Sequence, residues 1–265
     1  MLSYPSSMSV SSRSLNMLAG ALRHERRTRR TRWRRLDAGQ QALLVLAYLR
    51  KGETYADLAR GFGIGLATVF RYIHEALDVL AVMASSRDTA IDIARTKAFV
   101  ILDGTLLRID RIGMTGGRDR PFYSGKQKRH GLNVQVLTDP AGRLIWTSPV
   151  LPGARHDMGA AREHGVLDAL EEAEVRVIAD SAYRGAGANV EVPQRRPPRD
   201  PDTGQRRRRL SANEKAVNIA HARLRGPGER ANAQLKAWKV LRKVRSSPRQ
   251  ATHLVDAVRS LIHAD

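Results

Sequence analysis

The 265-residue sequence contains no cysteine. This absence excludes disulfide scaffolds, thiolate zinc fingers, iron–sulfur clusters and cysteine nucleophiles. Long hydrophobic runs are lacking as well, because the longest candidate, residues 43–49, is far shorter than the ~18 residues of a membrane span. The N-terminus also lacks the apolar core of a signal peptide. We therefore expect a protein of a reducing cytoplasm that makes no membrane contact.

Acidic residues are scarce relative to basic ones. The sequence has 26 Asp and Glu against 46 Lys and Arg, so its formal net charge is +20. An enzyme for small metabolites has no need of such a charge, whereas a polyanion partner does, and nucleic acid is the first candidate. Arginine greatly outnumbers lysine, which suits phosphate binding, although a GC-rich genome would produce the same bias.

The positive charge is concentrated in two segments. Residues 1–37 and 181–249 are strongly basic, whereas residues 38–180 are almost neutral. Either basic segment alone is compatible with a solvated or disordered run. Two of them around a neutral middle favour a surface that follows a phosphate backbone, with residues 1–37 as a basic N-terminal arm laid along DNA.

The first periodic region predicts a helix-turn-helix. Residues 38–51 and 55–62 have helical patterns, 63–65 form a glycine turn, and 66–80 predict a longer helix. The first turns of that last helix would present Thr68 and Arg71 to a major groove. A helical hairpin that only supplies core is the alternative. The upstream arginines favour a DNA-binding domain over 38–85.

The pattern changes between residues 85 and 98, which predicts a second domain over 96–265. Short apolar runs at 98–102, 132–138, 143–150 and 175–179 predict strands, and 158–174, 211–225, 229–244 and 248–264 predict helices. Residues 186–210 are rich in Pro, Gly and Arg and read as a basic insertion. The mixture predicts an α/β domain.

Three acidic residues are candidates for chemistry. Asp103 and Asp180 each follow a buried-type strand, and Glu229 lies in the first turn of a predicted helix. Each has an ordinary explanation, as a turn residue, a helix cap and a helix-dipole partner. In a cysteine-free basic chain, however, three such carboxylates are what a site for Mg²⁺ or Mn²⁺ needs, and two such ions catalyse phosphoryl transfer.

Other motifs are less informative. Gly125-Lys126 lacks the Ser or Thr and the first Gly of a phosphate-binding loop. His156-Asp157 is a local pair in which Asp157 alternatively caps a helix. Trp238 either stacks on an extruded base or belongs to the core, and we favour the core.

Several ordered motifs together resemble the DDE-type transposases of bacterial insertion sequences, the group related to the Harbinger-like endonucleases. The matching stretches span residues 54–244 and read TYADLARGFGIGLATVFRY, ILDGT, YSGKQKRHGLNVQVL, LPGARHD, IADSAYRGAG and ERANAQLKAWKVL. The resemblance implies a ribonuclease-H-like mixed-sheet catalytic core preceded by an all-α helix-turn-helix domain.

The resemblance also implies roles for individual residues. It places the three catalytic, metal-binding acids on Asp103, Asp180 and Glu229, with His156-Asp157 as an additional pair. Arg225, Glu229 and Lys236 match the spacing around the family's Glu. Two positions depart from the pattern, because Ala222 stands where relatives have Tyr and Ser181-Ala182 where they have Lys-Gly.

The sequence therefore predicts a transposase that binds the ends of its mobile element as a homodimer or larger assembly. It would cut and join double-stranded DNA with two metal ions at the nucleoid of a bacterial cell. Asp157 would assist the metal site, and Arg225, Arg230 and Lys236 would hold the DNA backbone. The alternatives are a non-enzymatic helix-turn-helix regulator, a binder of structured RNA and a decayed transposase copy.

Overall fold

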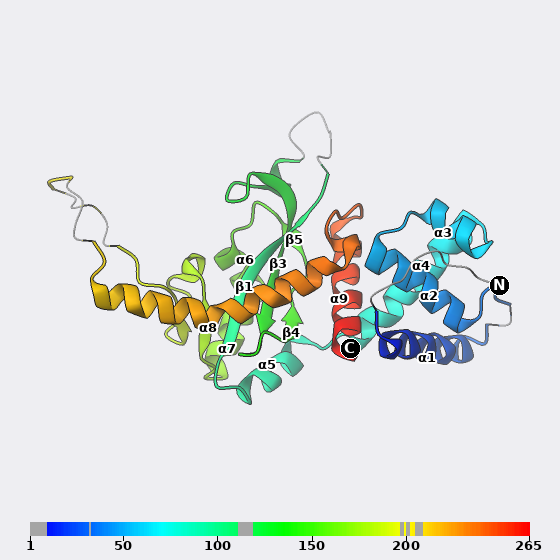
Figure 1. The fold of residues 1–265 in the computed structure, drawn as a ribbon, viewed down its shortest axis with the longest axis horizontal. Coiled ribbons are helices and arrows are strands. Elements are labelled where there is room, and N and C mark those ends of the chain that lie inside the picture. The colour runs from blue at the N-terminus through cyan, green and yellow to red at the C-terminus, as the bar shows by residue number, and fades with distance from the viewer. Residues whose placement is uncertain (1–9, 32, 111–118, 197–198, 200–201, 205–208) are drawn as a thin grey trace.

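The computed structural model describes residues 10–31, 33–110, 119–196, 199, 202–204 and 209–265. The molecule is elongated (Figure 1). A group of helices at the N-terminal end lies beside a mixed sheet, and a long helix crosses the sheet and projects beyond it. Within the described residues, no helix is both long and apolar enough to cross a membrane.

The N-terminal helices begin and end at residues whose local chemistry explains them. Asp37 and Gln40 form a reciprocal capping box at the start of α2, Thr54 caps α3, and Gly52 and Gly63 end these two helices in the left-handed conformation. The helices are α1 (Ser12–Thr28), α2 (Ala38–Lys51), α3 (Tyr55–Phe62), α4 (Leu66–Met83) and α5 (Arg87–Arg95). The predicted helices and glycine turn of the helix-turn-helix are confirmed.

The basic N-terminal segment differs from the prediction. Residues Ser12–Thr28 form a helix that packs into the core, because Leu18 and Leu22 are fully buried against α2 and α4. Arg34, one of the predicted arm residues, pairs with Glu75 of α4 at 2.6 Å. Arg32 and residues 1–9 lie outside the described residues.

A mixed sheet forms the centre of the second half. Strand β1 (Val100–Arg108) pairs antiparallel with β3 (Arg129–Thr138) and parallel with β6 (Val177–Ala179). The strand order is β2-β3-β1-β6-β7, and β4 and β5 also pair with β3. The remaining strands are β2 (Tyr123–Ser124), β4 (Leu144–Thr147), β5 (Leu151–Pro152) and β7 (Val190–Glu191). An N-terminal helical region followed by a mixed sheet with helices is consistent with the predicted ribonuclease-H-like core.

Helices cover both faces of the sheet. The helices of this half are α6 (Asp157–Glu163), α7 (Val166–Glu172), α8 (Ala212–Ala237) and α9 (Pro248–Ala264), and the short 3₁₀ turns are η1 (Arg120–Phe122), η2 (Ser181–Tyr183) and η3 (Lys239–Leu241). The single helix predicted over 158–174 is divided in two, because Gly165 takes the left-handed conformation between α6 and α7.

Helix α8 is continuous where the sequence predicts two helices. Pro227 lies inside it, although proline has no N–H for the helical hydrogen bond. Packing on the sheet compensates: a Cβ on Gly228 would approach Ile101 of β1 to 2.8 Å, so glycine allows the helix to lie close against the strand. The helix ends at Ala237, and Trp238 turns into the core with 2% of its surface exposed. The core interpretation of Trp238 is confirmed.

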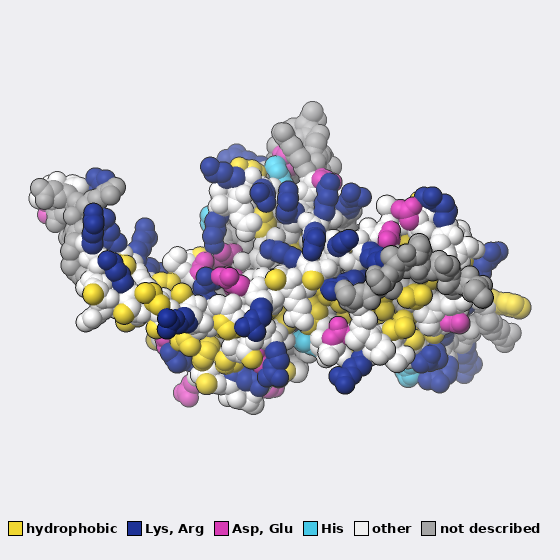
Figure 2. Space-filling view, viewed as in Figure 1, with side chains coloured by type: hydrophobic (Ala, Val, Ile, Leu, Met, Phe, Trp, Pro, Cys, Tyr) yellow, Lys and Arg dark blue, Asp and Glu magenta, His cyan; other side chains and the backbone are white. Residues whose placement is uncertain are grey.

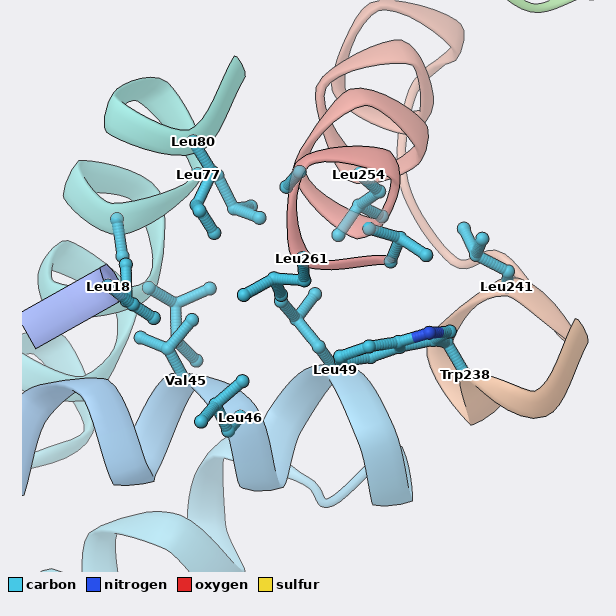
Figure 3. Packing of buried hydrophobic residues seen from close by; sticks show 14 of the residues in the cluster. Leu18, Val45, Leu46, Leu49, Leu77, Leu80, Trp238, Leu241, Leu254 and Leu261 are labelled. Atoms are coloured by element: carbon cyan, nitrogen blue, oxygen red, sulfur yellow. The ribbon is translucent and has the colours of Figure 1, made fainter. Parts of the chain in front are cut away.

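The C-terminal helix belongs to the same core as the N-terminal helices. Leu254 and Leu261 of α9 pack with Leu77 and Leu80 of α4, and Trp238 packs beside Leu49 of α2 (Figure 3). A second cluster, on the side of α5, α6 and α7, includes Val100 and Leu102 of β1. The predicted boundary between 85 and 96 therefore does not separate two independent cores, since α9 of the second segment is covered by helices of the first.

Candidate active site

The register of two parallel strands brings two distant acids side by side. Leu102 of β1 is opposite Ala179 of β6, so the next residues, Asp103 and Asp180, come level where β6 ends. Asp180 also caps η2, since its carboxylate accepts a hydrogen bond from the Ala182 N–H at 2.7 Å. The predicted cap is therefore present, and it holds the Asp180 carboxylate in place beside β1.

Asp157 joins these two acids from α6. It is the first residue of α6, and His156 is the N-cap, so the alternative in which Asp157 is the N-cap is wrong. The Asn133 amide of β3 donates to Asp157 Oδ1 at 2.8 Å. A Cβ on Gly104 would lie 2.2 Å from the same oxygen, so the glycine after Asp103 makes room for the Asp157 carboxylate. We call Asp103, Asp157 and Asp180 the acid cluster.

A lysine from the turn between β2 and β3 neutralises part of this charge. Lys126 Nζ lies 3.0 Å from Asp157 Oδ2 and 3.5 Å from Asp180 Oδ2, with the lysine side chain still 57% exposed. Partial burial lowers the pKa of Lys126, but the hydrogen bonds and charges of Asp157 and Asp180 outweigh it and raise the pKa overall. The sequence gives Lys126 no role of its own, since it stands in an incomplete phosphate loop and within one of the stretches that resemble the family.

The electrostatics of the acid cluster are those of a site that attracts cations. Burial raises the pKa of Asp103, and the charges of Asp180 and Asp157 raise it further, whereas Arg225 lowers it. The buried Tyr183 hydroxyl donates to Gln135 Oε1 at 2.6 Å, and burial followed by the same three carboxylates raises its pKa well above the ordinary value. Figure 2 shows acidic side chains gathered near α6 and α8, with Lys and Arg around them.

Helix α8 contacts the acid cluster through Asn232, which sequence reasoning missed. The Asn232 amide donates to Asp103 Oδ2 at 2.8 Å, and its own Oδ1 is buried and has no hydrogen-bond partner among the described residues. Glu229, one helical turn earlier, is 66% exposed at its side chain and pairs with Arg225 at 3.2 Å. Asn232 follows Glu229 by three residues on the same helix, which places both side chains on one face. This spacing is the sequence signal that points to Asn232.

The basic residues predicted to hold DNA lie along the same helix. Lys236 is half-buried, and burial lowers its pKa while the charge of Asp103 opposes this shift. Arg225 lies close enough to Asp103 to affect its pKa, and Arg230 is exposed. Of the three basic residues predicted on this helix, Arg225 and Lys236 are therefore near Asp103.

The chemistry of these residues fits a divalent metal ion. In the described part of the chain, no three His, Cys, Asp or Glu side chains are positioned to share one ion. The three carboxylates of the acid cluster nevertheless offer hard oxygen donors, and Lys126 supplies a positive charge between two of them. The Asn232 Oδ1 adds an unsatisfied oxygen beside Asp103.

The helix-turn-helix presents the predicted recognition residues at its surface. Val69, Ile73, Leu77 and Leu80 are buried, as the apolar face of α4 predicts. Arg71 is exposed and Thr68 half-buried, and the Arg71 guanidinium donates to the Thr68 hydroxyl at 3.4 Å. These two side chains thus lie together at the first turns of the longer helix.

Comparisons with known proteins agree with both parts of this description. Residues 102–262 match the family model of the DDE superfamily endonuclease, and residues 34–86 match that of the helix-turn-helix of the same superfamily. The chain is 31% identical over 215 residues to a protein assigned as the transposase for insertion sequence element IS112 of Streptomyces albus G, covering 79% of this chain and 73% of that protein.

A second relative is more distant. The chain is 24% identical over 241 residues to a protein assigned as the transposase for insertion sequence element IS702 of Microchaete diplosiphon, covering 88% of this chain and 82% of that protein. No solved structure matches the chain. The family match spans the acid cluster, α8 and most of α9. The chain therefore belongs to the DDE superfamily endonucleases and carries their helix-turn-helix domain in front of the endonuclease domain.

Proposed function

We propose that this protein is a transposase that binds the ends of its own mobile element and cuts the DNA there with divalent metal ions. The observation that carries the proposal is the convergence of Asp103, Asp157 and Asp180 from three separate elements. The three acids form a local centre of negative charge in a chain of net charge +20. An acidic centre on a DNA-binding protein repels phosphate unless cations neutralise it. Divalent metal ions bound to the carboxylates would provide that neutralising charge.

The residues of the site have separate tasks in this proposal. Asp103 and Asp180, with Glu229 from α8, would hold Mg²⁺ or Mn²⁺, and Asp157 with its neighbour His156 would support them. The ions supply activation of the attacking oxygen and stabilisation of the leaving oxygen. Water attacks the element end first, and the freed 3′-hydroxyl then attacks target DNA. Lys236, Arg225 and Arg230 bind the backbone around the scissile phosphate.

The position of Glu229 is compatible with this task. Asn232 contacts Asp103, and Glu229 is three residues earlier on the same helix, a rise of about 4.5 Å along the axis. Its partner Arg225 is near enough to lower the pKa of Asp103. Phosphate oxygens of bound DNA would compete with Glu229 for this arginine, and the Glu229 carboxylate would then be available to a metal ion.

The proposal is tested with the full chain and duplexes taken from the DNA that flanks its reading frame, where the proposal requires short inverted repeats. We expect cleavage at the repeat ends that requires Mg²⁺ or Mn²⁺ and leaves a 3′-hydroxyl. Repeat-specific binding without cleavage in either metal contradicts the proposal and favours the helix-turn-helix regulator or the decayed copy. A preference for structured RNA over duplex DNA also contradicts it and favours a binder of structured RNA. We also propose that the protein acts as a homodimer or larger assembly that holds the two element ends together, in the bacterial cytoplasm.

If the helix-turn-helix recognises the element ends, Arg71→Ala should weaken binding to element ends more than binding to unrelated DNA. Arg71 is exposed at the first turns of α4, where a base contact is worth about 1–3 kcal/mol. We expect the preference for element ends over unrelated duplex to fall about tenfold, while non-specific affinity changes little. Binding titrations on both duplexes measure this, with Arg95→Ala on α5 as a control that removes the same charge. Equal losses on both duplexes, or an equal effect of the control, would contradict the role.

Lys126 predicts a link between metal and stability. Its ammonium lies between Asp157 and Asp180, so Lys126→Met removes the positive charge that contacts both carboxylates. We expect the metal-free variant to lose about 1 kcal/mol or less of stability, because the lysine is half-exposed. We also expect Mn²⁺ to raise the melting temperature of the variant more than that of the unmodified chain.

The control for this prediction is Lys128→Met, an exposed lysine of the same turn. Thermal unfolding with and without Mn²⁺ is measured for all three proteins. If Mn²⁺ stabilises the Lys126 variant no more than the control, the ammonium of Lys126 does not stand where a metal ion binds.

A further inference from the structure

A cavity of about 500 Å³ lies away from the acid cluster, where the helix-turn-helix meets the C-terminal segment. Its walls come from the end of α2, the start of α3, the exposed side of α4, and the connection from η3 to α9 (Figure 1). The two sides approach closely, because the left-handed Gly52 at the end of α2 would place a Cβ 3.4 Å from Lys239 of η3. Elements far apart in the sequence thus enclose one space.

Aromatic rings line one wall of this cavity. The Tyr48 and Tyr55 rings are 5.5 Å apart, the Tyr55 and Phe70 rings 6.0 Å, and the Phe70 and His74 rings 3.9 Å, measured between centroids. Phe70 is 46% exposed, although it is a large apolar side chain on a helix with a well-buried opposite face. The row therefore offers flat ring surface to something that enters the cavity.

Basic side chains line the other wall. Lys239, Lys243 and Arg245 come from the connection between η3 and α9, and Lys51 comes from the end of α2. Lys243 also pairs with Asp110 at 2.9 Å, and the described lining includes one acid, Glu53. The cavity thus carries a net positive charge next to its aromatic wall.

These two walls match the two parts of a nucleotide. A base stacks on aromatic rings whatever its identity, and a phosphate binds lysine and arginine. The volume is that of an ordinary small-ligand site. A simple anion would bind the four cations but leave the four rings without contacts. A purely apolar ligand would contact the rings but make no ion pair with the cations.

The cavity borders the surface that the helix-turn-helix presents to DNA. His74 of the lining is three residues after Arg71, one turn further along α4, and Phe70 is the residue before Arg71. DNA held at Arg71 therefore passes beside the opening.

We propose that this cavity takes a single unstacked nucleotide of the DNA that the helix-turn-helix binds, with the base against Tyr55 and Phe70 and the phosphate at Lys239 and Arg245. The proposal rests on the proposed DNA-binding function. Extruding a base from a duplex costs stacking and pairing energy, and this cost is smallest where the base is already unpaired. The protein should therefore prefer DNA that offers an unpaired nucleotide.

The test compares two duplexes that differ by a single unpaired adenine bulge, using the full chain. Stacking of one base on an aromatic side chain gives about a fivefold to hundredfold effect. We expect the bulged duplex to bind at least fivefold more tightly than the paired one, and 2-aminopurine at the bulge to be quenched on binding. Phe70→Leu and Tyr55→Leu should remove this preference and the quenching, and leave affinity for the paired duplex within about twofold.

Two further variants distinguish a loss of nucleotide binding from a loss of folding. Lys239→Gln changes charge without disturbing ring packing and should reduce the bulge preference in the same way. Tyr123→Leu removes an exposed ring of β2, outside the cavity, and should change nothing. Thermal unfolding of each variant accompanies the binding data.

The outcomes separate the inference from the function on which it rests. Binding of the paired duplex without a bulge preference overturns the nucleotide cavity and leaves the DNA-binding function standing. Absence of duplex binding overturns both. A third arm titrates adenosine monophosphate alone: saturable binding that Phe70→Leu removes, together with no bulge preference, assigns the cavity to free nucleotides and overturns the proposal for DNA.

Discussion

Asp103→Asn is expected to abolish metal-dependent cleavage of element-end DNA while leaving DNA binding and folding intact. The amide keeps the shape of the side chain and can still accept the Asn232 hydrogen bond, but it has no charge to hold a divalent ion. Loss of a metal ligand costs several kcal/mol of transition-state stabilisation, so we expect a rate at least about a thousandfold lower. Asp180→Asn and Glu229→Gln should behave alike. Cleavage assays and binding titrations on the same end duplex measure both properties.

The stability of the same variant distinguishes a metal site from a turn residue. Burial and the neighbouring carboxylates raise the pKa of Asp103, so its charge is unfavourable in the metal-free folded protein. At neutral pH, Asp103→Asn should therefore be at least as stable as the unmodified chain without metal. As the pH falls through the folded-state pKa of Asp103, the unmodified chain takes up the proton and this difference shrinks, until it is gone below the unfolded-state pKa.

The matched control for these measurements is Asp168→Asn, an exposed acid in the first turn of α7. It should change neither cleavage nor the dependence of stability on metal. If Asp103→Asn instead loses about 1 kcal/mol of stability and keeps its cleavage rate, Asp103 is a structural residue and the proposed catalytic role is wrong. If Asp103→Asn, Asp180→Asn and Glu229→Gln all cleave DNA as fast as the Asp168→Asn control, the proposed metal site is wrong as a whole.

Deletion of residues 1–85 is expected to prevent folding of the remaining 86–265 fragment. The second domain that the sequence predicts over 96–265 would instead fold within this fragment. In the structure, however, α9 packs against α4 and α1, and Leu254, Val258 and Leu261 share their buried cluster with these helices. Exposing such side chains costs about 1.5–3 kcal/mol each. That loss is comparable with the whole stability of an ordinary domain, about 5–15 kcal/mol.

Circular dichroism, thermal unfolding and gel filtration of the fragment test this expectation. Leu261→Ala in the full chain provides a graded version, with an expected loss of about 2–5 kcal/mol because Leu261 is fully buried. Val82→Ala, which is 87% exposed on α4, is its control and should cost little. A monomeric fragment with a cooperative unfolding transition would show that α9 does not need the N-terminal helices.

Local signals allowed much of the helical structure to be predicted. Helices α2 and α3 have the predicted bounds, and α9 begins and ends at the predicted residues. Glycine turns, capping residues and the apolar stripe of α4 act within a few residues of chain, so the sequence carries them directly. The strands around 100, 132, 144 and 177 were found from short apolar runs, although β1 extends further than its apolar run, to Arg108.

The composition of the candidate site was determined partly by sequence and partly by the tertiary structure. The sequence identified Asp103 and Asp180 as strand-end acids and Asp157 as a member of a local pair. Only the parallel register of β1 and β6 placed the first two level, and only Gly104 and Asn133 explain how Asp157 lies over β1. Lys126 reaches the acid cluster from a turn distant in sequence, which no local pattern reports. Asn232 shares a helix face with Glu229, but only the packing of α8 on the sheet brings it to Asp103.

The joining of the two halves was decided by tertiary structure alone. An amphipathic pattern states that α9 has an apolar face, but not whether α4 or the sheet covers it. Likewise, Gly-Pro-Gly at 226–228 predicts a break on local grounds, whereas packing of Gly228 against Ile101 keeps α8 continuous. In each case the local preference is worth a few kcal/mol at most, and burial against a distant element outweighs it.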